Sequence, residues 1–122
     1  MQIRRFGTGA IRSSDHGKVD YEGFLSPLVI ERYGRYMLKH EILPDGSRRE
    51  SDNWQKGIEK SSYMKSAWRH FMDMWRLHRE GRGCSEEAQE AQCALLFNIM
   101  GYLHESIKEA RGNEGAPKSV NI

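Results

Sequence analysis

The sequence predicts an all-α fold with three principal helices. Three stretches place apolar side chains at helical spacing, each is bounded by a capping or turn signal, and no strand-like alternation competes with them. The length of 122 residues fits one domain that spans residues 1–122. Because 30% of the residues are charged and no apolar run approaches the roughly 20 residues that cross a bilayer, we expect a cytoplasmic protein that does not enter a membrane.

The first half of the chain holds an arm, one helix and a loop. Residues 1–25 show no sustained periodicity and are expected to form an ordered arm. The first helix begins at Ser26-Pro27, because serine suits the N-cap and proline the first helical position. It ends near Glu41, before the turn signal Pro44-Asp45-Gly46. Residues 42–62 are predicted to be a loop with one large apolar anchor, a tryptophan, and room for a short extra helical turn.

The second half of the chain holds two longer helices. The second helix runs from about Ser62 to Arg79 and is ended by Gly81-Arg82-Gly83. The third helix is capped by Ser85 and continues to about residue 109. The tail, residues 111–122, carries Gly, Asn and Pro and is predicted to be mobile.

The aromatic content of these helices predicts self-association. Three helices in a chain of this length bury little apolar surface. Trp68, Phe71, Trp75 and Phe97 exceed what a lone monomer would cover. We therefore expect a homodimer in which the copies complete a four-helix core.

Two pairs of ligand-type side chains lie on the two longer helices. His70-x-x-Asp73 is on the second helix and Glu87-x-x-Glu90 is on the third. Residues three apart share a helix face, so a hairpin of these helices would point the four side chains into one cleft. Carboxylate-rich sites bind Mg²⁺ or Mn²⁺, and such a cation in a helical bundle suits phosphate chemistry. We call His70, Asp73, Glu87 and Glu90 the acidic group.

The members of the acidic group also have ordinary structural interpretations. Glu86 and Glu87 occupy the first turn of a helix, where acidic side chains interact favourably with the helix dipole. His70 and Asp73 could form a surface pair.

Asn98 lies on the same stripe as Glu90, beside the apolar face, where an unpaired amide would cost roughly 1–3 kcal/mol. We therefore expect Asn98 to bond to a neighbouring helix or to a ligand.

Two further segments carry groups that suit a phosphorylated ligand. The segment Ser51-Asp52-Asn53-Trp54-Gln55-Lys56-Gly57 has amides that can read a nucleobase edge, an indole that can stack and a lysine that can meet a phosphate. From spacing alone, the favoured interpretation is a loop whose Trp54 plugs the core. In the arm, Arg12 and Lys18 could wrap a phosphorylated ligand, although the order of residues in a Walker A loop is missing.

Charge and cysteine content limit the other function classes. The net charge of +2 argues against a dedicated duplex-binding protein, so no nucleic-acid partner is expected. Local basic pairs such as Arg48 and Arg49 suffice for a small anion such as a triphosphate. Cys84 and Cys93 are expected to be reduced thiols, because a disulfide would have to join a loop to the middle of the next helix. A zinc site of His70, His78, Cys84 and Cys93 would match no finger or ribbon spacing.

Several short motifs together resemble a known family. They are Gly9-Ala10, Gly17-Lys18, Leu25-Ser26-Pro27, Asp52 to Gly57, Trp68-Arg69-His70 and Ala94 to Asn98. Over roughly residues 7–109, the chain resembles the small phage-encoded dATP/dGTP diphosphohydrolase-like proteins, called MazZ in phages with modified adenine. These are similar to the MazG-like all-α nucleoside triphosphate pyrophosphohydrolases.

The resemblance implies a fold, an assembly and a reaction. The fold would be a MazG-like helical bundle that forms a dimer or tetramer and binds two or more Mg²⁺ or Mn²⁺ ions per site. The reaction would convert a purine deoxynucleoside triphosphate, dGTP and also dATP, into the monophosphate and pyrophosphate. In phages that replace adenine by 2-aminoadenine, dGMP would be the starting point for the modified nucleotide.

The resemblance also implies roles for particular residues. MazG-like enzymes show Glu-Glu-x-x-Glu on one helix, which Glu86-Glu87-x-x-Glu90 matches, and Glu-x-x-Asp on the next, which this chain lacks. The matching partner lies upstream, at His70-x-x-Asp73. The metal ligands would be Asp73, Glu87, Glu90 and His70, with Glu31 as a further candidate, and Glu86 and Glu87 would take part in catalysis. The residues that would bind substrate are Asn53, Trp54, Lys56, Arg69, Asn98 and Lys18.

Two other function classes stay open. In a non-enzymatic helical interaction or regulatory protein, the acidic side chains would be solvated and the aromatic side chains would form a partner surface. A small nucleic-acid-binding module could use the basic arm, although the low net charge and the acidic group disfavour it.

Overall fold

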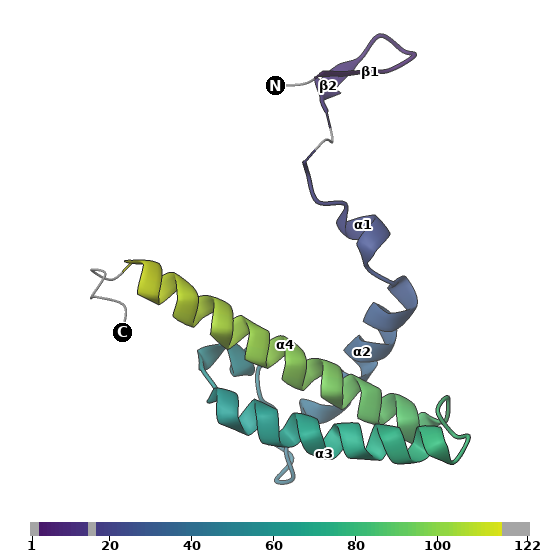
Figure 1. Ribbon diagram of the computed structural model, residues 1–122, viewed down its shortest axis with the longest axis vertical. Helices are drawn as coiled ribbons and strands as arrows, with labels where there is room; N and C mark the ends of the chain where they lie inside the picture. Colours follow the sequence, from purple (N-terminus) through teal and green to yellow (C-terminus); the bar gives the residue numbers. More distant parts are fainter. Residues whose placement is uncertain (1–2, 15–16, 116–122) are drawn as a thin grey trace. The chain divides into compact units, whose positions relative to one another are not determined.

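The computed structural model describes residues 3–14 and 17–115, and most of these residues are helical (Figure 1). The chain divides into two compact units, Met1–Glu31 and Arg32–Ile122. The boundary falls within helix α2 (Pro27–His40). No helix in the described segments combines the length and apolar character that a membrane span requires.

The first unit contains a small β-hairpin and a short helix. Strand β1 (Ile3–Arg5) pairs with strand β2 (Ile11–Ser13) in antiparallel register. Helix α1 (Tyr21–Phe24) is capped by the Asp20 carboxylate, which accepts a hydrogen bond from the backbone N–H of Gly23 at 3.0 Å. The sequence analysis predicted an ordered arm here and did not foresee these two strands. Three-residue strands are too short for side-chain alternation to reveal them.

Helix α2 begins where its sequence signals place it. The Ser26 hydroxyl accepts a hydrogen bond from the backbone N–H of Val29 at 3.3 Å, and Pro27 is the first helical residue. The following loop is tied by an isolated bridge between Ile42 and Arg48 and contains one short 3₁₀ helix, η1 (Asn53–Lys56). The prediction of a loop with one short helical turn is confirmed.

Two long helices form the main body of the second unit. Helices α3 (Lys60–Arg79) and α4 (Glu86–Gly115) lie side by side as a hairpin (Figure 1). Helix α4 continues through residues 111–115, which the sequence analysis had assigned to the tail. One glycine within a helix costs only about 1 kcal/mol, so Gly112 does not end it. The rest of the predicted tail, residues 116–122, lies outside the described residues.

The core of the hairpin is narrow because α4 presents small side chains to α3. The buried side chains of this core are Tyr63, Leu77, Ala88, Ala91, Cys93 and Ala94. Buried Gly101 lies directly against the ring of Tyr63, where a larger residue would not fit. By contrast, Trp68, Phe71 and Trp75 on α3 are 43–62% exposed, so the described chain leaves much of its aromatic surface uncovered.

Candidate functional site

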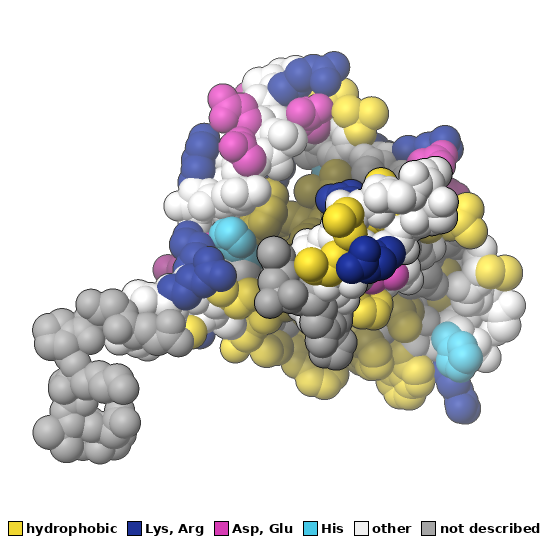
Figure 2. Space-filling model, turned by 90° about the horizontal axis from the view of Figure 1, so that it is seen from above, with side chains coloured by type: hydrophobic (Ala, Val, Ile, Leu, Met, Phe, Trp, Pro, Cys, Tyr) yellow, Lys and Arg dark blue, Asp and Glu magenta, His cyan; other side chains and the backbone are white. Residues whose placement is uncertain are grey.

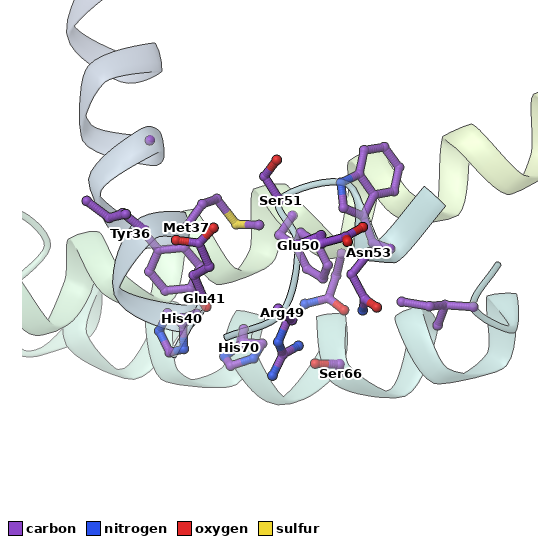
Figure 3. A pocket seen from close by; sticks show the side chains of 16 residues that line it. Tyr36, Met37, His40, Glu41, Arg49, Glu50, Ser51, Asn53, Ser66 and His70 are labelled. Carbon is purple, nitrogen blue, oxygen red and sulfur yellow. The ribbon is translucent and has the colours of Figure 1, made fainter. Parts of the chain in front are cut away.

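The second unit contains a pocket of about 450 Å³ (Figure 3). The end of α2, the loop that follows it, η1 and the facing sides of α3 and α4 all contribute to its wall. The polar and aromatic side chains that line it are Tyr36, His40, Glu41, Arg49, Glu50, Ser51, Asn53, Trp54, Ser66, His70, Phe97 and Asn98.

A tight turn brings the loop back over the end of α2. Gly46 has φ of +86°, a conformation that glycine adopts without strain. The backbone N–H and the hydroxyl of Ser47 both donate to the Asp45 carboxylate, at 2.9 and 2.6 Å, and these bonds lower the pKa of Asp45. The backbone N–H of Arg49 then donates to the Glu41 carbonyl at 2.9 Å. The turn thus places Arg49 and the next residue, Glu50, at the pocket.

Three nitrogen-bearing side chains gather along one side of the pocket. Figure 3 shows His40 from α2, Arg49 from the loop and His70 from α3 close to one another. Partial burial lowers the pKa of His40, and the positive charges of Lys39, Arg49 and His70 lower that pKa further. We call His40, Arg49 and His70 the cationic group. Its members repel one another when protonated, so an anion bound among them would be favoured.

An aromatic and amide wall occupies another part of the pocket. Trp54 is half-buried, with its ring centroid 4.7 Å from that of His104 and 6.5 Å from that of Phe97. Asn53, which precedes it at the start of η1, also lines the pocket. Trp54 therefore anchors the loop on α4, as the spacing predicted, and also forms part of the pocket wall.

Asn98 has a different partner from the one expected. This side chain is 6% exposed and lines the pocket, and its Nδ2 donates to the backbone carbonyl of Ala94 on the same helix at 2.7 Å. The expectation of a bond to a neighbouring helix is wrong, because the preceding turn of α4 supplies the acceptor. With Nδ2 used in this way, Oδ1 is the atom that can accept a hydrogen bond from a ligand.

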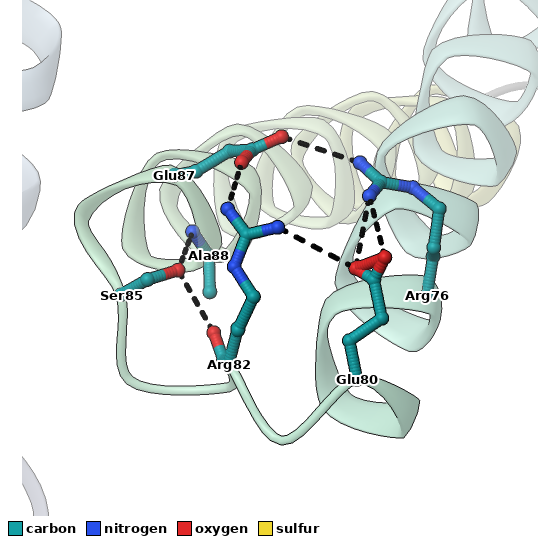
Figure 4. A network of polar contacts seen from close by, with 6 residues as sticks. All are labelled: Arg76, Glu80, Arg82, Ser85, Glu87 and Ala88. Atoms are coloured by element: carbon teal, nitrogen blue, oxygen red, sulfur yellow. Dashed lines mark hydrogen bonds and ion pairs between the residues drawn. The ribbon is translucent and has the colours of Figure 1, made fainter.

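Glu87, one of the four members of the predicted acidic group, pairs with arginines at the end of the hairpin. Figure 4 shows Glu87 between Arg76 and Arg82, with N···O distances of 3.2 and 2.9 Å. The same arginines contact Glu80, at 3.2 and 3.6 Å. Ser85 caps α4 by accepting a hydrogen bond from the Ala88 N–H at 3.1 Å, as predicted. In this arrangement, Glu87 links the two helices through arginine.

The other glutamates of the motif hold α2 against α4. Arg32 lies 3.0 Å from Glu86 and 3.4 Å from Glu90, and its Nε donates to Gln89 at 2.9 Å. Lys39 also forms an ion pair with Glu90. Both α2 cations lie on the same side of that helix, seven residues apart, so the acidic motif meets a matching basic face.

The predicted metal ligands do not gather into one site. His70 lines the pocket, whereas Asp73 lies in a separate surface hollow with Met72, Trp75 and Arg76. Within residues 3–14 and 17–115, no three His, Cys, Asp or Glu side chains are grouped as a metal ion would require. The carboxylates that do line the pocket are those of Glu41 and Glu50.

The predicted substrate-binding residues divide between the pocket and other surfaces. Asn53, Trp54 and Asn98 line the pocket, while Lys56 and Arg69 are exposed and do not. Lys18 belongs to the first unit, where its ammonium donates to the Ser13 hydroxyl at 2.7 Å. Sequence reasoning missed His40. Its only signal was its place in the last turn of α2, just before a turn that reverses the chain.

Comparisons with protein-family models, with curated proteins and with solved structures find no match to this chain. The geometry of the pocket and the motifs of the sequence are therefore the basis for a functional proposal.

Proposed function

We propose that this chain is a nucleotide pyrophosphohydrolase that cleaves a purine deoxynucleoside triphosphate to the monophosphate and pyrophosphate. The observation that carries the proposal is that one pocket contains both an aromatic and amide wall and a cationic group. A volume of about 450 Å³ is within the usual range for small-molecule sites. The family resemblance of the sequence motifs supports the same reaction.

The wall formed by Trp54, Asn53 and Asn98 would hold the base. Indole surfaces bind flat aromatic ligands, and side-chain amides form hydrogen bonds with the edge of a purine. Since Asn98 Nδ2 already donates to Ala94, its Oδ1 would accept a hydrogen bond from an amino or imino group of the base. Guanine offers its exocyclic amino group and N1–H as donors of this kind, and adenine offers its exocyclic amino group, so both dGTP and dATP fit as substrates.

The cationic group would hold the phosphates. A guanidinium can bind phosphate oxygens through two parallel hydrogen bonds, and an imidazole N–H adds a further donor. Arg49 lies on the loop, while His40 and His70 lie on helices, so the three contacts would fix the phosphates from different directions. Holding the chain of phosphates in one geometry is a large part of the catalysis of phosphoryl transfer.

A divalent cation would reach this pocket together with the triphosphate. Mg²⁺ is commonly bound by one or two carboxylates plus substrate phosphates, and Glu41 and Glu50 are the carboxylates available to it here. Bound Mg²⁺ or Mn²⁺ would neutralise phosphate charge and acidify a water molecule. A second ion at Glu87 or Glu90 would first have to displace the basic side chains that now pair with them.

Product analysis tests the reaction. The chain is incubated with dGTP, dATP, dTTP or dCTP in the presence of Mn²⁺, and pyrophosphate, phosphate and mononucleotide are quantified. We expect pyrophosphate and dGMP as the main products, which in a phage with 2-aminoadenine would feed the modified nucleotide. Release of inorganic phosphate, or no turnover of any substrate, would refute the proposal.

A matched pair of arginine variants tests the site. Arg49→Gln should raise KM for dGTP by at least about tenfold, because a charged hydrogen bond to phosphate is worth about 1.5–3 kcal/mol. Arg48→Gln removes the same charge one residue earlier, on a side chain that is absent from the pocket wall and lies 3.5 Å from Glu41. Equal effects of the two substitutions would show that phosphates are not bound where we place them.

A further inference from the structure

The part of α2 that belongs to the second unit, residues 32–40, has little apolar packing to hold it. No residue of α2 is buried, and Tyr33 and Tyr36 are only partly covered. Figure 2 shows that a broad band of hydrophobic side chains stays at the surface along one side of the molecule. Burial of apolar surface therefore contributes less to the attachment of α2 than to the α3–α4 hairpin, whose core includes Tyr63 and Leu77.

Polar contacts, most of them made by one arginine, attach α2 to α4. Arg32 Nη2 lies 3.0 Å from Glu86 and 3.4 Å from Glu90, and Arg32 Nε donates to Gln89 at 2.9 Å. Lys39, about two turns further along α2, pairs with Glu90. The side chains of Arg32 and Glu90 are each 25% exposed, so water screens this pair less than a fully exposed one. Because the guanidinium is planar and reaches three acceptors, these contacts fix the rotation of α2 as well as its position.

The rotation of α2 matters because Arg32 lies on the same side of this helix as two pocket residues. Tyr36 follows Arg32 by four residues and His40 follows Tyr36 by four, so the three side chains lie on adjoining turns. The ring centroids of Tyr36 and His40 are 4.4 Å apart, and Figure 3 shows both side chains at the pocket. The contacts that fix Arg32 on α4 therefore also fix the direction from which His40 reaches the pocket.

The acidic motif Glu86-Glu87-x-x-Glu90 already has basic partners for each of its carboxylates. Glu86 and Glu90 pair with the two cations of α2, and Glu87 pairs with two arginines that it shares with Glu80. Four carboxylates thus meet four basic side chains, and their charges balance. A divalent cation at this motif would face repulsion from the same basic side chains, which disfavours its binding there.

We propose that Arg32 and Lys39 are positioning residues of the pocket and that Glu86 and Glu90 are their anchors on α4. The acidic motif then supports catalysis by fixing α2, and metal binding is not its role. The effect on turnover rests on the proposed function. The attachment of α2 does not, because it can be measured without any nucleotide.

An exchange of charges between the two helices tests the attachment. One variant carries Arg32→Glu with Lys39→Glu, a second carries Glu86→Lys with Glu90→Lys, and a third carries all four substitutions. Like charges face one another in each two-site variant, so amide hydrogen exchange across residues 32–40 should be at least about tenfold faster than in the native chain, as measured by mass spectrometry. The four-site variant restores opposite charges and should restore slow exchange. Slow exchange in α3 and α4 shows that each variant is folded.

Two results of this measurement would overturn the proposal. One is unchanged exchange across residues 32–40 in both two-site variants, and the other is fast exchange there in the four-site variant. Arg32→Gln keeps the test decisive if a two-site variant fails to fold, because it removes one cation without adding repulsion. It should accelerate the same amides by a smaller factor, and no acceleration would count against the proposal.

Turnover of dGTP with Mn²⁺ separates positioning from metal binding. The two-site variants should lose at least about tenfold in kcat/KM, mainly through KM, because small displacements of a binding group have large effects. The four-site variant should recover most of this loss, although both glutamates are replaced. Slow exchange without recovered activity in that variant would show that the carboxylates act on the reaction directly, and would overturn the proposal. A native chain without turnover refutes the proposed function alone, because the exchange rates still decide whether these contacts hold α2.

Glu109→Lys is the control for a change of charge at an ion pair. Glu109 lies 2.6 Å from Lys60, and it is 19 residues, or about 28 Å along α4, beyond Glu90. This variant should leave both the exchange of residues 32–40 and the KM for dGTP unchanged. Equal acceleration of α2 by Glu109→Lys would show that exchange there responds to any change of charge, and would overturn the proposal.

Discussion

Replacement of Gly101 by alanine should destabilise the chain, although helix propensity alone predicts the reverse. An alanine in a helix interior is about 1 kcal/mol more favourable than a glycine. At position 101, however, an added Cβ would overlap ring atoms of Tyr63 and would lie 2.7 Å from its hydroxyl oxygen. The methyl group and the ring cannot both keep their places.

The ring of Tyr63 has little freedom to move away. This side chain is 2% exposed, and its centroid lies 5.9 Å from that of Phe97 in an edge-to-face contact. Overpacking of such a site costs about 1–3 kcal/mol, and an overlap with ring atoms belongs at the upper end. After the gain in propensity, the free energy of unfolding should fall by about 2 kcal/mol. The melting temperature should then fall by roughly 10 °C.

Urea unfolding followed by circular dichroism measures the change, and Gly112→Ala is its control. Gly112 lies on the same helix, is exposed, and has no neighbour within 4 Å of an added Cβ, so alanine there should stabilise by up to about 1 kcal/mol. In a Tyr63→Leu background, which lacks the overlapping ring atoms, Gly101→Ala should no longer destabilise. A Gly101→Ala chain as stable as the native one, measured in the native background, would refute the packing argument.

Three other substitutions test separate features. Tyr63→Phe should change the free energy of unfolding by less than about 1 kcal/mol in thermal melts, because the buried hydroxyl has no hydrogen-bond partner in the described structure. Glu87→Gln should lower the melting temperature by only a few degrees, and by less in high salt, since its arginine partners are half exposed. The His40 pKa is lowered in the folded chain, so the unfolded chain binds a proton first as the pH falls below about 6.5. Stability should therefore decrease in that window, and the decrease should be smaller in His40→Gln when urea midpoints are compared at about pH 7 and about pH 5.5.

Local signals in the sequence were sufficient to predict the long helices. Ser26 and Pro27 define the start of α2 because capping depends on neighbouring backbone groups alone, and the structure shows the expected bond to Val29. The aromatic residues Trp68, Phe71 and Trp75 were also evident, but their spacing does not reveal which surface covers them. The β-hairpin escaped detection because each strand has three residues, fewer than an alternating pattern requires.

The residues of the pocket could be predicted only in part, because local sequence shows residue types but not the contacts that folding creates. Asn53 and Trp54 stood out because their residue types suit a nucleotide at short spacing, and His70 stood out as a candidate metal ligand. A turn of the chain brings Arg49 close to His40, where its charge lowers the His40 pKa. A contact of this kind depends on how the chain folds, so local sequence does not reveal it. A histidine at the end of a helix has no distinctive local pattern, so sequence reasoning had no reason to select it.

The acidic motif Glu86-Glu87-x-x-Glu90 has a spacing that suits two different kinds of partner. Glu86 and Glu90 lie one turn apart and share a helix face, a spacing that suits either a divalent cation or a basic side chain. In the structure, Arg32 contacts both carboxylates and Lys39 contacts Glu90. These contacts fix α2 on α4, and α2 in turn carries His40 to the wall of the pocket. The motif thus acts on the pocket through the position of α2, and an ion that displaced Arg32 from Glu90 would have to compensate for the loss of that attachment.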